Sequence, residues 1–352
     1  MPRKPETSAP PPHLLRLLPA AALPGGDLRI EGQGLAPHGS QWPVVQFGEV
    51  SGPIWMSSET ALMVRVPEGA LSGAVQVNPA GGSNGTASNE LHVDIAVPIS
   101  EELHPVANPV VDRQGNIYAT FSGARGQGVP VSLFRIDANY NVKPLPASVL
   151  NPTGLALDRE GVLFVSSRHE GSVYRVAANG MAVTYAEGMG VATGLAFDAA
   201  ENLYVGDRSG TIFKIDRERK TFVFATLEPS IAAYHLAFGP DQYLYVAGPT
   251  TSSFDTVWRV SPQGAVEPFF RGLGRPQGLA FDRLGNLYIA ASLRGRRGIV
   301  RIAPNGEAQL AISGYNLVGL AFAPGPALIL ATGGAVFHLD WKVAGLALPP
   351  QP

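Results

Sequence analysis

One phrase recurs at regular intervals from the middle of the chain onward, and it restricts the fold more than any other feature. Its clearest copies read NPTGLALDREGVLFVSS, VATGLAFDAAENLYVGD and RPQGLAFDRLGNLYIAA. Anchored on the first residue of the GLA phrase, the copies fall at Pro109, Gly154, Gly194, His235, Gly278 and Gly319. The period is about 41 residues, which is the size of one four-stranded propeller blade.

Each copy contains four short β runs separated by turns. In the second copy the runs are GLALD, VLFVSS, SVYRVA and AVTYAE. A single sheet of this kind cannot bury both of its faces, so neighbouring units must cover one another. The small GLA residues suit the innermost strand, where the sheets converge. We therefore predict an all-β fold in which residues 108–348 form a six-bladed β-propeller.

Two segments compete for the outer strand of the last blade. Residues 343–348 follow directly on that unit, whereas residues 99–106 precede the first unit and would lock the ring. Both are short and apolar enough for a strand. The sequence leaves this choice open.

Residues 13–96 lack the repeat and show a different alternation. The runs LRIEG, VVQFG, ALMVRVP and GAVQVNPAGG are spaced by Gly, Pro and Ser turns. Such spacing is typical of a β-sandwich. We predict a disordered tail over 1–12, a sandwich over 13–96 and a linker over 97–107.

Composition excludes several functional classes. The chain has no cysteine, so a disulfide framework, a thiolate nucleophile and a Cys-ligated metal are all ruled out. The formal net charge of -2 gives no global attraction to nucleic acid or anionic membrane. Arg16 and Pro19 interrupt the N-terminal apolar stretch, which is therefore no export signal. We expect a soluble, cytoplasmic protein without a membrane partner, with an idle sequon at Asn84; non-classical export stays an alternative.

The first domain resembles the IPT/TIG family, which has an immunoglobulin-like fold. The resemblance rests on the turn Pro24-Gly25-Gly26, the apolar strand after it and Gly32, followed by VVQFGEV and SSETALMVRVPEGALSGAVQVN. It implies a spacer, a partner-binding module or a DNA-contact module. No part of this segment is basic enough for DNA.

The repeat region resembles the NHL and gluconolactonase-like propellers, a superfamily that includes the senescence-marker-protein-like enzymes. The resemblance implies a divalent metal on the axis in the lactonase members, held by a Glu, Asn and Asp set just before the innermost strands. Hard oxygen ligands of this kind bind Ca²⁺ and polarise a lactone carbonyl. The corresponding positions here are Asn108, Thr153, Thr193, Tyr234, Gln277 and Val318.

No carboxylate stands in this axial ring, and Asp207 and Glu102 lie outside the ligand positions. A metal-dependent lactone or ester hydrolase with a degenerate site, in which Ca²⁺ lies near Asn108, Thr153, Thr193 and Gln277, is therefore the alternative function. Tyr234 and His235 replace the usual Thr-Gly or Gln-Gly. They form either a ligand-reading or general-base pair or a plug in a wide channel.

A basic rim is predicted on the same face, because the loops between second and third strands are rich in arginine. Its residues are Arg125, Arg168, His169, Asp207, Arg208, Arg294, Arg296 and Arg297. Guanidinium groups bind carboxylates and phosphates bidentately. The leading hypothesis is a non-catalytic binding or scaffold protein that takes an anionic small molecule or peptide at the axial face.

Two alternatives remain for parts of this rim. Arginines in Gly-rich loops are often only solvated, and Asp207 beside Arg208 either orients a ligand or forms a local ion pair. Single-stranded RNA would also require aromatic stacking platforms, for which only Tyr234 and Phe254 are available. We do not expect a nucleic-acid partner.

Overall fold

The structure of the protein is a computed structural model that describes residues 11–80 and 86–347. Within these residues every regular element is a strand, which confirms the all-β prediction. No helix in the described ranges is long and apolar enough to cross a membrane. Residues 1–10 of the predicted tail, Asn84 of the sequon and Leu348 at the predicted end of the ring lie outside the described residues.

The chain divides into two compact units. The first comprises Met1–Val97 with Leu310–Tyr315, and the second comprises Pro98–Gln309 with Asn316–Pro352. Most of the first unit precedes the first copy of the repeat, and most of the second unit consists of its copies.

The first unit contains two sheets. One has the order β1 (His13–Leu18), β3 (Asp27–Gln33), β7 (Ala61–Arg65), β6 (Ile54–Ser57). The other has the order β9 (Leu91–Ile95), β8 (Gly73–Asn78), β4 (Val44–Phe47), β5 (Val50–Gly52), with the short β2 (Ala21–Ala22) beside β9. All these neighbours are antiparallel except β2 and β9.

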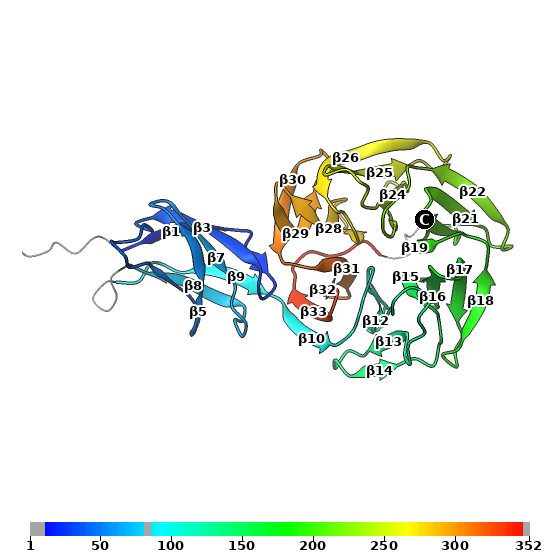
Figure 1. Ribbon diagram of the computed structural model, residues 1–352, viewed down its shortest axis with the longest axis horizontal. Coiled ribbons are helices and arrows are strands. Elements are labelled where there is room, and N and C mark those ends of the chain that lie inside the picture. The colour runs from blue at the N-terminus through cyan, green and yellow to red at the C-terminus, as the bar shows by residue number, and fades with distance from the viewer. Residues whose placement is uncertain (1–10, 81–85, 348–352) are drawn as a thin grey trace, which may run out of the picture. The chain divides into compact units, whose positions relative to one another are not determined.

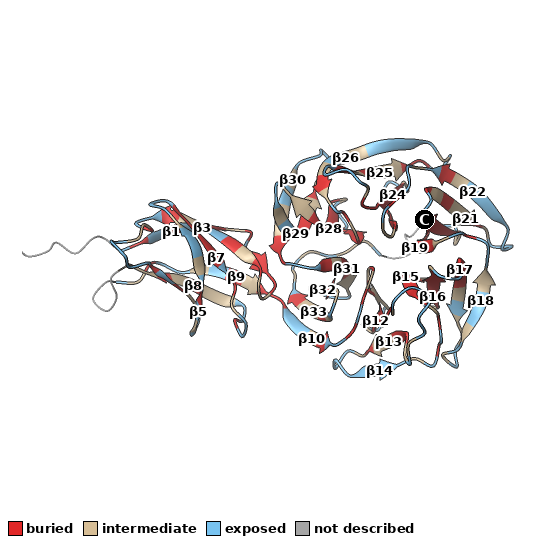
Figure 2. Cartoon of the chain, in the orientation of Figure 1, coloured by how far each residue is buried: buried red, intermediate tan, exposed pale blue. Residues whose placement is uncertain are grey.

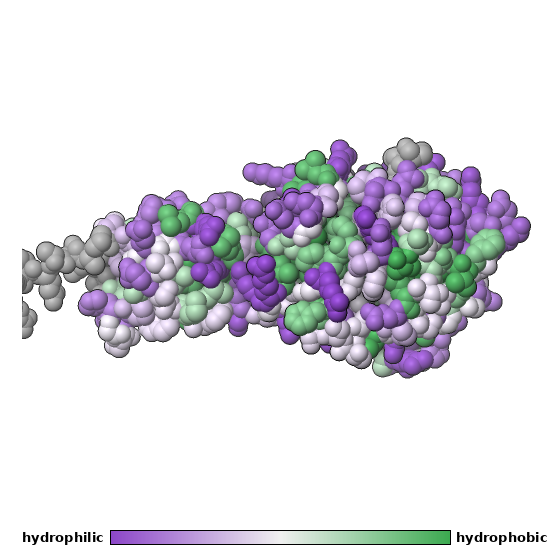
Figure 3. Space-filling view, turned by 90° about the horizontal axis from the view of Figure 1, so that it is seen from above, coloured by the Kyte–Doolittle hydropathy of each residue, from purple (hydrophilic) through white to green (hydrophobic). Residues whose placement is uncertain are grey.

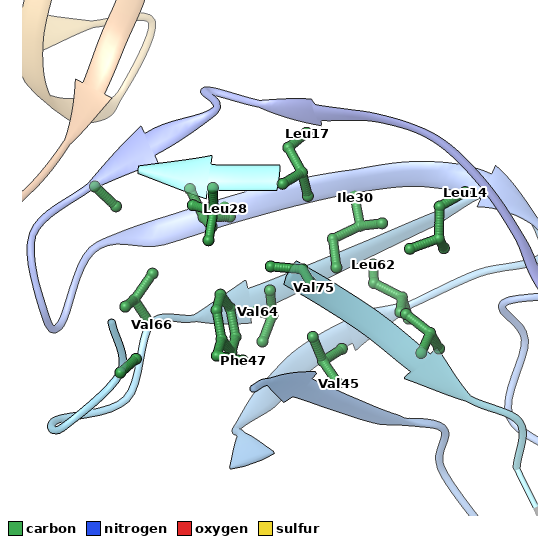
Figure 4. Close-up of a cluster of buried hydrophobic side chains, with 14 of the residues drawn as sticks. Leu14, Leu17, Leu28, Ile30, Val45, Phe47, Leu62, Val64, Val66 and Val75 are labelled. Atoms are coloured by element: carbon green, nitrogen blue, oxygen red, sulfur yellow. The ribbon is translucent and has the colours of Figure 1, made fainter. Parts of the chain in front are cut away.

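The two sheets share one apolar core. Strand β3 alternates buried and less buried residues, so that Leu28 and Ile30 point to the same side, as the two-residue period of a strand requires. Figure 4 shows these two side chains directed towards Phe47 and Val75 of the other sheet. The whole cluster is nearly inaccessible to solvent, and it draws residues from both sheets.

The second unit repeats one four-stranded antiparallel sheet. The first three copies are β11 (Val110–Val111) to β14 (Val142–Pro144), β15 (Pro152–Leu157) to β18 (Ala182–Ala186), and β19 (Ala192–Phe197) to β22 (Thr221–Thr226). Between these end strands lie β12 (Ile117–Thr120), β13 (Leu133–Ile136), β16 (Leu163–Ser167), β17 (Ser172–Val176), β20 (Leu203–Asp207) and β21 (Thr211–Ile215).

The later copies continue the pattern. They are β23 (His235–Phe238), β24 (Leu244–Ala247), β25 (Asp255–Val260) and β26 (Val266–Gly274), then β27 (Leu279–Phe281), β28 (Leu287–Leu293), β29 (Arg296–Ile302) and β30 (Ala308–Ser313). The last copy consists of β31 (Leu317–Ala323), β32 (Ala327–Thr332) and β33 (Ala335–Asp340), with β10 (Val97–Glu101) beside β33. Figure 1 shows the sheets following one another around a common centre, and Figure 2 shows that the strands near this centre are buried.

The placement of β10 resolves the open question of the outer strand. Val97–Glu101 lies next to β33, so a segment from before the first sheet completes the last one. Ile99 and Leu103 add their side chains to the core of Ile117 and Ile329. The segment that we expected to be a linker is thus in part a strand, because its apolar residues cover the otherwise open edge of β33.

The outer strands carry much of the exposed surface of this unit. Strands β14, β18 and β22 are mostly exposed or half-buried, whereas β16 and β20 are buried throughout. In the side view of Figure 3, small hydrophobic patches alternate with hydrophilic side chains. Burial therefore increases from the outer to the inner strands of each sheet.

The repeated glycines mark where inner strands meet. A Cβ atom on Gly194 would lie 2.5 Å from the carbonyl oxygen of Tyr234, and one on Gly319 would lie 2.6 Å from Cα of Asn108. Backbone cannot move aside as a flexible side chain can. At Gly194 and Gly319, only glycine allows the neighbouring inner strands to approach this closely.

We expect the substitution Gly194→Ala to lower the free energy of unfolding by roughly 1–3 kcal/mol, because the added methyl group overpacks this contact. Chemical denaturation measures the change. Gly334→Ala is the matched control, since a Cβ atom there meets nothing within 4 Å. Equal stability of the two variants would contradict the close approach of the inner strands.

Candidate functional site

Half of the predicted axial ring is buried: Thr153, Thr193 and Tyr234 are inaccessible, whereas Asn108, Gln277 and Val318 are half-buried. Thr153 and Thr193 are each 1% exposed. The hydroxyl of Thr193 donates to the carbonyl oxygen of Gly206 (2.8 Å) and accepts from the backbone N–H of Tyr234 (3.1 Å). The hydroxyl of Thr153 donates to the carbonyl oxygen of Asn151 (3.3 Å). The Thr193 hydroxyl thus joins neighbouring strands and that of Thr153 bonds within its own segment, so both are engaged inside the protein.

Tyr234 and His235 are buried in the same region. The Tyr234 hydroxyl donates to the carbonyl oxygen of Glu228, its ring packs against Gly248, and burial raises the pKa of its phenol. Burial also lowers the pKa of His235 to about 4, so this imidazole is neutral at pH 7. Of the two interpretations of this pair, its burial favours the plug.

Asn108 occupies a different register from the one that we expected. Val110 pairs with Tyr118 as Ala156 pairs with Phe164, so Asn108 stands at the position of the repeated glycine rather than before it. Its amide Nδ2 donates to the carbonyl oxygen of Leu279 (2.8 Å), and its Oδ1 accepts from the N–H of Leu320 (3.0 Å). The side chain fills the space beside Gly278 and Gly319.

The axial residues do not fit a divalent metal. Gln277 is half-buried, and its backbone N–H donates to the carbonyl oxygen of Ala290 (2.9 Å). Glu102 is exposed. No group of three or more His, Asp or Glu residues that could hold a metal ion occurs in the described part of the chain. Ca²⁺ requires several oxygen ligands around one point, and the threonine hydroxyls here are already engaged. We derive no metal-dependent step.

Three arginines form what we call the basic cluster: Arg125, Arg168 and Arg208. Arg168 is half-buried, and its Nη2 donates to the hydroxyl of Ser122 and the carbonyl oxygen of Gly123 (3.3 Å each). Its Nε is buried without a hydrogen-bond partner. Burial, and then the positive charges of Arg125 and Arg208, lower the pKa of Arg168. Arg125 and Arg208 are thus both close enough to repel the guanidinium group of Arg168.

Asn151 holds the loop that carries Arg125. Its Oδ1 accepts from the N–H of Gly126 (2.6 Å), and its Nδ2 donates to the carbonyl oxygens of Gly123 and Ala124 (2.9 Å each). The ring of the exposed His169 lies against Gly126, where a Cβ atom would be 3.3 Å from Cε1. Sequence reasoning missed Asn151, although it opens the second copy of the repeat.

The neighbouring carboxylates are engaged elsewhere. Asp207 is 6% exposed and accepts from the N–H of Val191 (2.8 Å) and from the N–H and hydroxyl of Ser209. Glu170 accepts from the hydroxyl of Tyr174 (2.8 Å). Across the described ranges, no ion pair involves an arginine of the basic cluster. Asp207 therefore shapes the turn before Arg208 and forms no local ion pair with it.

The other predicted rim arginines lie on a separate hairpin. Arg294, with Gly295, makes the tight turn between β28 and β29 at positive φ angles of 51° and 80°. Arg294 lines a surface pocket together with Arg301 and Glu307. The charges that lower the pKa of Arg168 do not include those of Arg294, Arg296 and Arg297. The structure thus brings together only part of the predicted rim.

A cavity of about 400 Å³ lies on the axis below the glycine positions. Its walls are formed by the residues that come directly after these glycines in the inner strands, and by the turns that follow those strands. The alanine of the GLA phrase keeps 6–8% exposure in five copies: Ala156, Ala196, Ala237, Ala280 and Ala321. The cavity therefore lies at the other end of the inner strands from the predicted ring, and sequence reasoning missed it although the repeated alanine was its signal.

Comparison with known proteins identifies the fold of the second unit. No family model matches the chain, and no curated protein matches it. A putative gluconolactonase of known structure has a TM-score of 0.58 at 16% identity, covering 72% of this chain and 94% of its own. A gluconolactonase from Xanthomonas campestris has a TM-score of 0.56 at 16% identity, covering 70% and 89%. The second unit is a β-propeller.

A third match extends beyond the propeller. An auxiliary nutrient binding protein from Bacteroides thetaiotaomicron has a TM-score of 0.55 at 11% identity, covering 94% of this chain and 98% of its own. At such identities the likeness concerns the fold alone. Activity and ligand must therefore be argued from the side chains of the propeller itself.

Proposed function

We propose that the protein is a non-catalytic binding protein whose basic cluster takes an anionic group of a small molecule or peptide. The carrying observation is the Nε of Arg168, a buried donor without a partner beside two further positive charges. A buried donor that lacks an acceptor costs free energy. A carboxylate or phosphate would accept from this guanidinium and offset the repulsion among the three arginines.

The architecture that we propose is an immunoglobulin-like domain of the IPT/TIG kind, followed along the chain by a six-bladed propeller. The six copies of the repeat and the succession of four-stranded sheets support the propeller. The two sheets of the first unit, packed over one core, support the immunoglobulin-like domain. The first unit would serve as a spacer or docking module, since the charged side chains that gather on its strands, such as Arg16, Arg29 and Glu31, are paired with one another.

The neighbours in fold point to two different functions. One is described as a nutrient binding protein, which agrees with ligand capture, and others are described as gluconolactonases. Lactone hydrolysis through a bound metal would need ligands that the axial residues do not supply. The metal-dependent hydrolase therefore stays the alternative, and binding of a divalent metal would favour it.

A thermal-shift screen of the full chain tests the proposal. The probes are citrate, inorganic phosphate and gluconate, with Ca²⁺, Mg²⁺, Zn²⁺ and EDTA in parallel. An anion that binds only the folded state at 100 times its Kd stabilises the protein by about 2.7 kcal/mol. We expect stabilisation by an anion that EDTA leaves unchanged. Stabilisation by Ca²⁺ alone, reversed by EDTA, would instead favour the hydrolase, and no shift with any anion would count against the proposal.

A further inference from the structure

The axial cavity of the propeller is lined mainly by hydrocarbon. Leucine, alanine and phenylalanine side chains of the inner strands form its walls, among them Leu155, Leu195, Leu236, Ala280 and Phe322. Its volume of about 400 Å³ lies within the range of ordinary small-molecule sites. Size and lining are therefore those of a ligand site.

Two polar side chains at its walls, those of Asn108 and Asp112, are already bonded within the protein. The Asn108 amide is bonded to Leu279 and Leu320. The carboxylate of Asp112 accepts from two backbone N–H groups of its own turn, from Nδ2 of Asn116 and from the hydroxyl of Tyr118. The two arginines in the lining, Arg113 and Arg283, are exposed to solvent. A charged group buried among the leucine and alanine side chains would lack a partner there, which is costly.

The end of the described chain lies over this cavity, and we call residues 344–347 the C-terminal strap. The N–H of Arg283 donates to the carbonyl oxygen of Ala344 (3.0 Å), and the N–H of Leu346 donates to the carbonyl oxygen of Phe281 (2.8 Å). Gly345 lies so close to Phe322 that no side chain fits there. The strap is thus paired with the end of one inner strand, β27, while its two alanines stay exposed.

We propose that the axial cavity is a binding site for a neutral, apolar small molecule and that the C-terminal strap is its cover. Apolar cavities exclude water and accept apolar ligands, and each Å² of apolar surface removed from water contributes about 25 cal/mol. The proposal goes beyond anion binding at the basic cluster. The two sites are separate because the lining of the cavity includes none of Arg125, Arg168 and Arg208.

Fluorescence titration of the full chain with N-phenyl-1-naphthylamine, a neutral apolar probe, tests this site. We expect saturable enhancement with one site per chain that citrate does not displace. Ala321→Phe places a ring in the cavity and should abolish the enhancement, whereas Ala178→Phe, in an exposed turn, should keep it. Should Ala321→Phe fail to fold, the smaller change Ala237→Leu takes its place and should weaken binding at least severalfold.

The strap is tested in the same assay. Gly345→Val cannot fit against Phe322, so it should displace the strap without changing any strand of the sheets. Stopped-flow mixing should then show faster association and faster release of the probe. Absence of saturable binding to the folded wild-type chain, or unchanged binding to a folded Ala321→Phe variant, would overturn the site. Rates unchanged in Gly345→Val would overturn the role of the strap.

Discussion

Charge reversal at Arg168 and Arg208 is expected to abolish the binding of whichever anion stabilises the wild-type protein. Each charge-assisted hydrogen bond contributes about 1.5–3 kcal/mol, so a single Arg168→Glu substitution should weaken binding at least about tenfold. The double variant adds repulsion between two carboxylates and the anion. Isothermal titration calorimetry with the same anion measures the loss.

Two controls separate a local site from general electrostatics. Arg297→Glu changes the net charge equally but lies on the hairpin that does not act on Arg168, so it should leave the affinity nearly unchanged. Arg168→Gln tests the charge of the site, because its amide could still donate towards Ser122 and Gly123. Equal losses in Arg297→Glu and Arg208→Glu would contradict the basic cluster as the binding site.

Acidification is expected to destabilise the protein through His235. The pKa of this histidine is about 4 in the folded state, against an ordinary value of 6.5. Between these values the unfolded chain binds a proton that the folded chain does not, so stability falls as the pH drops below about 6.5. The full effect near pH 4 is roughly 3 kcal/mol, because each unit of pKa difference corresponds to 1.36 kcal/mol.

Urea denaturation between pH 7 and pH 4 measures this contribution. The variant His235→Phe has no ionisable group at this position and should lose less stability on acidification than the wild type. His38→Phe, an exposed substitution of the same kind, should follow the wild type. A wild-type pH dependence retained in His235→Phe would show that the loss comes from other groups.

The repeat predicted the strands well because its turns carry their own signal. The carboxylate of Asp158 accepts from the N–H groups of Glu160 and Val162, and Asp198 binds Ala200 and Asn202 in the same way. Such local bonds fix the end of one strand and the start of the next without help from distant residues. Strand positions could therefore be derived from the sequence copy by copy.

The details of the axis could not be predicted in the same way. The first copy lacks the glycine, and the sequence analysis placed Pro109 at its position; the pairing of Val110 with Tyr118 shows that Asn108 stands there instead. The burial of Thr193 depends on how closely adjacent inner strands approach, which the period does not determine. The strap over the cavity depends on contacts between residues far apart in the chain, such as Phe281 and Leu346.

The basic cluster was predicted only in part, for a related reason. The spacing of the loops placed all the arginines on one face, but it did not show which carboxylates are engaged in their own turns. Asp207 and Glu170 both look available in the sequence, yet their bonds to Ser209 and Tyr174 remove them as partners of arginine. Which arginines remain without a carboxylate partner therefore depends on how the loops fold.

The most direct test is anomalous diffraction from crystals soaked in selenate, an oxyanion that can be located without ambiguity. We predict a selenium peak at the basic cluster, with a selenate oxygen within hydrogen-bonding distance of the Arg168 guanidinium, and no peak inside the apolar axial cavity. An ordered Arg168 whose Nε is bonded to a protein oxygen, with no peak at the basic cluster, would contradict the proposal that this propeller binds anions there.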